Sequence, residues 1–242
     1  MKMKAQSNTL VLSYLWWVLE PLLYVLLFYF VFKFVLYRGG DNFLMFLILG
    51  KIPFLWFSKG VSSGSSAITE NKGLISQRVI PKYIFPLVNC QESTYKQIFA
   101  FFVLFTAVSA GGYTPTVNWL LLVPLILLNY LLICGVALFF SFFSTLAPDF
   151  KVAIQMFMMC LMFTSGIFWD VNLIQDQQLK SLLMHINPLA AIIDGYRQII
   201  MHNAPLKMTY MLAVFAWSLL AICLGAFMLH HCSNFLTRKL FA

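Results

Sequence analysis

Charged residues are scarce in this chain of 242 residues. Asp, Glu, Lys and Arg together make up only 10%, against about 25% in a typical soluble domain. Apolar residues fill the deficit at 61% of the sequence, where about 45–50% is usual. A soluble fold of this length exposes too much surface to hide so many apolar side chains from water. The composition therefore excludes an ordinary soluble domain and predicts a protein embedded in lipid.

The sequence also lacks the motifs of several catalytic classes. It contains neither GxxxxGK[ST] nor a GxGxxG after a strand, so the chain alone cannot hydrolyse ATP by the usual route. There is no HExxH, and the five cysteines show neither a CxxC nor a disulfide framework. The serine-rich stretch at 61–66 has no GxSxG elbow, which favours close helix packing over a nucleophile. We predict no catalytic residue, metal site or cofactor in this chain.

Six apolar stretches are long enough to cross a membrane, since each span needs about 20 residues. The predicted spans are residues 14–35, 43–64, 90–110, 119–146, 150–169 and 209–229. The first run is too long for a signal peptide and has no small-residue cleavage site, so it is expected to remain as a span. The sequence thus predicts an all-α integral membrane protein of about six transmembrane helices in a single domain, residues 1–242.

The net charge of +8 indicates an orientation rather than a nucleic-acid partner, because Lys and Arg collect in cytoplasmic loops. With the N-terminus inside, the inner segments hold Lys2, Lys4, Lys59, Lys72, Arg78, Lys82, Lys96, Lys151, Arg238 and Lys239. The outer segments hold Lys33, Arg38, Lys180, Arg197 and Lys207. This asymmetry predicts that both termini are cytoplasmic.

Two loops are large enough to carry function. The internal loop, residues 65–89, is basic and is interrupted by Pro81 and Pro86. The external loop, residues 170–208, contains apolar segments that are too short to span the membrane. Such segments are typical of re-entrant or interfacial helices, and Asn187-Pro188 is the expected break between two of them.

Charges inside spans are costly in lipid and usually face a cavity or a partner. For Lys51, a cavity and snorkelling to the outer interface are equally supported. For Glu20, a structural pair or cap is favoured. Glu92 and Lys96 are four residues apart, which predicts a local ion pair.

Four segments, in order along the chain, match motifs of one family. Residues 14–23 read YLWWVLEPLL, similar to a G-Y-L-W-x-x-x-x-P opening of a first span. Residues 49–56, LGKIPFLW, and 71–75, NKGLI, resemble a second span and its exit. Residues 78–86, RVIPKYIFP, contain P-K-x-x-F-P, and residues 187–197 contain N-P-L…Y-R. The chain therefore resembles the ABC-2 type permeases that export polysaccharides, the membrane subunits of O-antigen, capsule and teichoic-acid exporters. Lys51 departs from the family pattern, where an uncharged residue is usual.

The resemblance implies two copies of the chain around a pore in a bacterial inner membrane. Two ATPase subunits beneath would bind ATP and Mg, and the substrate would be an undecaprenyl- or other lipid-linked polysaccharide. The internal loop is then the candidate for coupling to the ATPase, through a short helix docked on it, although a plain connecting loop is the alternative. The candidate coupling residues are Glu70, Asn71, Lys72, Arg78, Pro81 and Lys82.

The external loop is the candidate gate under the same resemblance. The candidate channel or gate residues are Trp16, Glu20, Lys51, Trp56, Trp169, Asn187, Pro188, Asp194, Tyr196 and Arg197. The guanidinium of Arg197 is expected either to meet a phosphate or acidic sugar or to pair with Asp194 or Asp170. The tryptophans are expected at the membrane interface, although aromatic faces also stack on sugars.

Three other functions compete with polysaccharide export. A drug or small-lipid exporter of the same superfamily is the nearest alternative, and the motif matches favour the polysaccharide branch. A membrane-embedded enzyme needs clustered polar residues, and only Asp194, Arg197 and His202 approach such a cluster. A passive assembly subunit predicts that charge changes at 70–82 leave function intact.

Overall fold

The computed structural model describes residues 19, 22–23, 26–27, 29–35, 42–77 and 80–241. The predicted first span lies partly outside these residues, and its described part includes a π-helical turn, η1 (Val31–Val35). Trp16, Glu20 and Arg78 also lie outside the described residues. Their predicted roles stay predictions.

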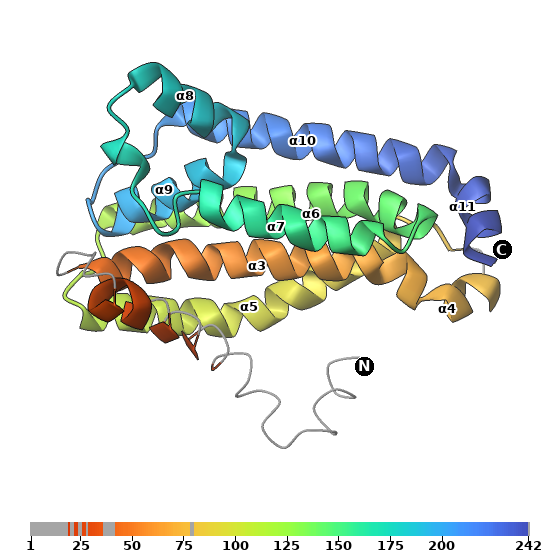
Figure 1. The fold of residues 1–242 in the computed structure, drawn as a ribbon, viewed down its shortest axis with the longest axis horizontal. Coiled ribbons are helices and arrows are strands. Elements are labelled where there is room, and N and C mark those ends of the chain that lie inside the picture. Colours follow the sequence, from red (N-terminus) through yellow and green to blue (C-terminus); the bar gives the residue numbers. More distant parts are fainter. Residues whose placement is uncertain are drawn as a thin grey trace.

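Long apolar helices lying alongside one another form the body of the molecule (Figure 1). They are α3 (Phe43–Glu70), α5 (Ile84–Ala110), α6 (Leu122–Leu146) and α10 (Met208–His231). A 3₁₀ turn, η2 (Val117–Leu121), leads into α6. Each of these four is long and apolar enough to cross a membrane, and the described residues contain no strand. The prediction of an all-α membrane fold is confirmed.

The helix bounds differ from the predicted spans at several ends. Helix α3 continues to Glu70, past the predicted limit of 64, and α5 begins at Ile84 rather than 90. Helix α7 (Phe150–Thr164) has 15 residues and ends before the predicted limit of 169. It ends there because Gly166 takes a positive φ of 72°, which turns the chain out of the helix. At 15 residues, α7 is shorter than the ~20 that a perpendicular crossing needs.

The two ends of the bundle carry different short elements (Figure 1). One end, here called the α8/α9 end, holds η3 (Val171–Leu173), α8 (Gln177–Ile186) and α9 (Pro188–Ile200). The opposite end, the α4/α11 end, holds α4 (Lys72–Gln77) and α11 (Ser233–Phe241). Asn187 separates α8 from α9, so the prediction of two short helices with a break at Asn187-Pro188 is confirmed.

Glycines bring α6 and α10 into close contact. A Cβ at Gly135 would lie 2.9 Å from the Ser218 carbonyl oxygen, and one at Gly225 would lie 2.6 Å from the Phe139 amide nitrogen. Membrane helices associate through such close packing, because lipid provides no hydrophobic drive between them. The α6–α10 pair therefore depends on the absence of side chains at these two positions.

A Gly225→Ala substitution tests this dependence. The added methyl group must push the two backbones apart, so we expect a loss of about 1–3 kcal/mol in stability, as for other overpacked cores. Gly73→Ala in α4 is the matched control, because its Cβ meets nothing within 4 Å. Thermal unfolding in detergent measures both variants, and equal unfolding temperatures would contradict the packing argument.

Candidate functional site

The start of α9 is fixed by the Asn187-Pro188 pair. The Asn187 side-chain oxygen accepts hydrogen bonds from the backbone amides of Leu189 (3.1 Å) and Ala190 (3.2 Å), which have no partner within the helix. Pro188 occupies the first turn, where its missing N–H costs nothing. The first half of the N-P-L…Y-R motif is therefore a helix start, and it sets the angle at which α9 enters the bundle.

The same asparagine joins α9 to the turn that follows α7. Its side-chain Nδ2 donates to the Ser165 hydroxyl at 3.0 Å. Ser165 is fully buried and directly precedes Gly166. The position where α7 ends and the position where α9 begins are thus held together by one polar contact.

Arg197 makes the most extensive polar contacts at the α8/α9 end. Its guanidinium donates to the carbonyl oxygens of Phe46 (3.1 Å from Nη2, 3.3 Å from Nε), Gly166 (2.6 Å) and Ile167 (3.0 Å). Its Cζ atom also lies 3.3 Å from the centroid of the Phe46 ring. The side chain is only 3% exposed. One residue of α9 thereby holds the first turn of α3 and the turn after α7, and we call this set of contacts the arginine clasp.

Two glycines leave room for the arginine clasp. A Cβ at Gly50 of α3 would stand 2.7 Å from Arg197 Nη2, so no larger residue fits there without moving the guanidinium. The Gly166 carbonyl accepts a hydrogen bond from Arg197, and the positive φ of Gly166 makes the turn that follows α7. Sequence reasoning identified Arg197 but missed Phe46, Gly50 and Gly166, since backbone carbonyl partners leave no motif.

Asp194 belongs to a separate polar group beside the arginine clasp. Its carboxylate accepts a hydrogen bond from Asn172 Nδ2 at 3.0 Å, and Asn172 also binds Asp170 (2.9 Å) and accepts from Lys180 (2.9 Å). Within the described residues, Arg197 forms no ion pair with Asp194 or Asp170; the expected pairing is replaced by the carbonyls of the clasp. No sequence motif points to Asn172, which connects η3, α8 and α9.

The predicted aromatic residues lie at different depths. Tyr196 and Trp56 are 0% and 1% exposed, and each packs against Phe101 of α5. Both are therefore core residues of this chain. Trp169 is half-buried in the loop after α7, and its Nε1 donates to the Phe163 carbonyl at 2.8 Å.

Lys51 is buried inside the bundle. Its side chain is 3% exposed, and the ammonium lies 3.0 Å from the Met162 sulfur of α7 and 5.5 Å from the Phe54 ring centroid. Snorkelling predicts an ammonium that reaches the interface, and a buried one against α7 does not fit it. The charge instead lies at the α3–α7 contact.

The α4/α11 end presents an exposed helix. Asn71 ends α3 with its side-chain Nδ2 bonded to the Ala67 carbonyl at 2.7 Å, and α4 follows with no buried residue. Leu74, in the middle of α4, is 51% exposed. Glu70 and Lys72 are exposed as well, and the Lys72 ammonium lies 5.0 Å from the Phe241 ring centroid of α11. The expected short helix in the internal loop is therefore present.

Lys82 fixes the return of the chain from α4 to the bundle. Its Nζ donates to the Ser233 hydroxyl at the start of α11 at 2.6 Å, and the side chain is 7% exposed. Burial lowers the pKa of this ammonium below its usual value. Pro81, just before it, is exposed. The coupling candidates Glu70, Asn71, Lys72, Pro81 and Lys82 thus lie at one end, and two of them, Lys72 and Lys82, contact α11.

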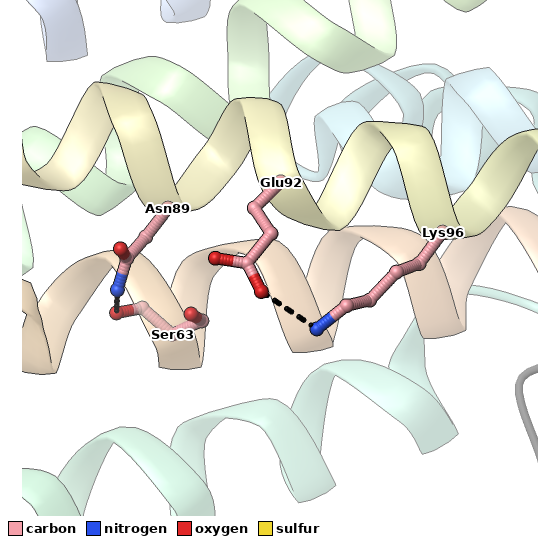
Figure 2. A network of polar contacts seen from close by, with 4 residues as sticks. All are labelled: Ser63, Asn89, Glu92 and Lys96. Atoms are coloured by element: carbon pink, nitrogen blue, oxygen red, sulfur yellow. Dashed lines mark hydrogen bonds and ion pairs between the residues drawn. The ribbon is translucent and has the colours of Figure 1, made fainter. Parts of the chain in front are cut away.

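A polar stripe runs along one face of α3, α5 and α7. Figure 2 shows Asn89, Glu92 and Lys96 extending from α5 across α3, where Asn89 donates to the Ser63 carbonyl at 3.0 Å. The predicted Glu92–Lys96 ion pair is confirmed at 2.9 Å. A polar hollow of about 210 Å³ continues the stripe between α3 and α7. The stripe comprises Ser62, Ser63, Ser66, Glu70, Asn89, Glu92, Lys96, Lys151 and Gln155.

Comparison with known proteins gives a consistent result. The family model described as "ABC-2 type transporter" matches residues 3–201. An O-antigen export system permease protein RfbA from Klebsiella pneumoniae is 25% identical over 224 residues, covering 92% of this chain and 85% of that protein. The RfbA protein of Myxococcus xanthus is 22% identical, with 82% and 76% covered. The polysialic acid transport protein KpsM of Escherichia coli is 28% identical, with 78% and 74% covered.

An Arg197→Gln substitution tests the arginine clasp. It leaves the buried carbonyls of Gly166 and Ile167 without the guanidinium donors, at about 1–3 kcal/mol for each unpaired group, and it also removes the contact with Phe46. We therefore expect a large fall in the unfolding temperature of the purified protein, and Arg197→Lys should restore little of it because it lacks the planar fork. Arg238→Gln on exposed α11 is the control. An Arg197→Gln protein as stable as wild type would show that the guanidinium does not hold the α8/α9 end.

Proposed function

The chain belongs to the ABC-2 type transporter family, and from that membership we propose that it is the permease subunit of a polysaccharide exporter. In this proposal it moves a lipid-linked polysaccharide of the O-antigen or capsule type across the bacterial inner membrane. It is a multi-pass transporter subunit rather than an enzyme. A separate ATPase subunit hydrolyses ATP with Mg and drives transport.

The agreement among the relatives is the observation that supports a polysaccharide substrate. The proteins named as O-antigen permeases come from two genera, and the one named for polysialic acid transport comes from a third. These alignments cover 74–85% of the relatives, so the match extends over most of the transport domain. Polysialic acid and O-antigens are both polymers of sugars. We therefore assign a polysaccharide substrate to this permease.

The polar stripe supports a sugar polymer over the alternative of a drug or small lipid. Burying Lys151, Glu92 and several hydroxyls against lipid is costly, so this face of the bundle is expected to line a hydrated path. A hydrated path suits a polymer rich in hydroxyl groups better than it suits an apolar drug. The stripe begins near the α4/α11 end, where a polymer from the cytoplasm would enter.

Exposed α4 supports the proposal of an external ATPase. The sequence has no phosphate-binding loop, so a transporter of this kind needs a partner that supplies the energy. We assign α4 to the contact with that partner, and Lys82 then transmits its movement to α11 through Ser233. We further propose a homodimer with both termini in the cytoplasm, in keeping with the basic residues near the α4/α11 end.

The gate in this proposal is the α8/α9 end. The arginine clasp attaches α9 to both α3 and the turn after α7, so these three segments are expected to move as one piece. Arg197 accordingly serves the gate by positioning it, and it meets phosphate or acidic sugar only if the clasp opens. Asp194 and Lys180, joined through Asn172, form a buried polar group beside it.

Surface polymer in a deletion strain tests the substrate class. Complementation with wild type is expected to restore export of the O-antigen or capsule polymer, measured on whole cells with a polymer-specific antibody. A deletion that leaves surface polymer unchanged would sink the polysaccharide proposal and favour the drug or small-lipid exporter. Drug sensitivity and lipid export in the same strains then measure that alternative.

A Leu74→Asn substitution tests α4 as the coupling helix. Leu74 is 51% exposed and supports no core, so its loss is expected to abolish most export while membrane levels stay normal. Val117→Asn in η2, 82% exposed and outside the segments assigned to coupling or to the gate, is the matched control and should export like wild type. Co-purification with the ATPase provides a second readout. Normal export by Leu74→Asn would favour the alternative that residues 70–82 are a plain connecting loop.

A further inference from the structure

A large apolar cavity lies beneath α8, away from the residues assigned to coupling. Its volume is about 540 Å³, within the ~300–1,000 Å³ range of ligand sites in proteins. Its walls come from α3, α6, α7, α8, α9 and α10. Representative lining residues are Phe57, Leu132, Phe157, Leu182 and Ala221.

Every polar side chain in the wall is already bonded within the protein. The Trp217 Nε1 donates to the His185 carbonyl at 2.8 Å, and the Thr164 hydroxyl donates to the Cys160 carbonyl at 3.0 Å. Asn187 is occupied by Ser165 and the start of α9. The cavity therefore offers no hydrogen bond to a sugar, a phosphate or water, and apolar cavities of this kind do not hold water.

Helix α8 depends on something that fills this space. Leu179, Leu182 and Ile186 lie on one stripe of α8 and line the cavity, yet they are 53%, 56% and 60% exposed. Only Lys180 and Met184 of α8 are buried. In water, leaving this apolar stripe uncovered would cost about 25 cal/mol for each Å², whereas hydrocarbon covers it at no such cost.

The depth of the cavity along the span α10 indicates what kind of molecule occupies it. Trp217 and Ala221 lie nine and thirteen residues into α10, or about 14–20 Å from its start at a rise of 1.5 Å per residue. That depth is inside the hydrocarbon core, which is about 30 Å thick. At this level the surrounding solvent is acyl chain.

We propose that the cavity binds one acyl chain of a membrane phospholipid, which fills the space between α8 and the rest of the bundle. A wall of apolar side chains whose few polar groups are all bonded within the protein complements a hydrocarbon chain. The site thus binds a hydrocarbon chain of the bilayer, and α8 rests partly on lipid.

Photo-crosslinking of the full-length protein tests this directly. The permease is placed in vesicles of phosphatidylethanolamine and phosphatidylglycerol that contain a small fraction of phosphatidylglycerol with a diazirine on its acyl chain. After irradiation, mass spectrometry locates the adducts. We expect adducts on Phe157 and Leu182 several-fold above those on Phe102 of α5, a 70% exposed reference. Adducts no more frequent than on Phe102 would overturn the proposal.

Two variants separate the cavity from the general lipid surface. Val136→Phe fills the cavity from α6 and is expected to reduce the adducts on Phe157 and Leu182 several-fold, with those on Phe102 unchanged. Ala216→Phe adds the same ring to an exposed position of α10 outside the cavity, and should leave all adducts as in wild type. Equal labelling in the two variants would overturn the proposal.

A competition arm identifies the source of the chain. Excess unlabelled polyprenyl phosphate is added to the vesicles before irradiation. Acyl adducts that persist support a phospholipid occupant. Loss of the cavity adducts, with Phe102 still labelled, would assign the cavity to a prenyl chain and overturn the phospholipid assignment.

Discussion

A buried positive charge organises the α8/α9 end of this molecule. Removing a guanidinium from water is costly, and the cost is offset only when its donors are satisfied. Arg197 satisfies them with carbonyls of α3 and of the turn after α7, and with the face of Phe46. Because those groups come from segments about 150 and 30 residues away in the chain, neither the turn nor the entry of α9 can shift without exposing unpaired polar groups. The short helices therefore form a defined layer over the bundle.

The body of the fold was predictable because hydrophobic length is a direct physical signal in membrane proteins. The bounds of α6 and α10 follow closely from where apolar residues begin and end. The ends that sequence reasoning misplaced depend on other causes. Helix α7 stops at a glycine with positive φ, and α3 extends to Glu70 through Ser65, Ser66 and Thr69, polar residues that hydropathy does not assign to a span.

The candidate site likewise has features that could be predicted from the sequence and features that could not. The break at Asn187-Pro188 and the short helix at 72–77 were predictable, since capping and proline chemistry are local. The partners of Arg197 and the burial of Lys51 were not, because they depend on which carbonyls and sulfur atoms the tertiary fold brings near. An arginine three residues after Asp194, in a loop that also contains Asp170, suggests an ion pair. In the structure, one of those aspartates, Asp194, turns to Asn172 and leaves the arginine to the backbone.

The shortness of α7 has a consequence for the membrane itself. Fifteen residues at 1.5 Å per residue extend about 22 Å, whereas the hydrocarbon core is about 30 Å thick. A span shorter than the hydrocarbon core is accommodated by local thinning of the bilayer, by flanking residues that reach the interface, or by association with another helix, each at a fraction of a kcal/mol for each Å of mismatch. Among the longer helices of the described residues, α7 is therefore the one whose fit depends most on the thickness of the surrounding bilayer.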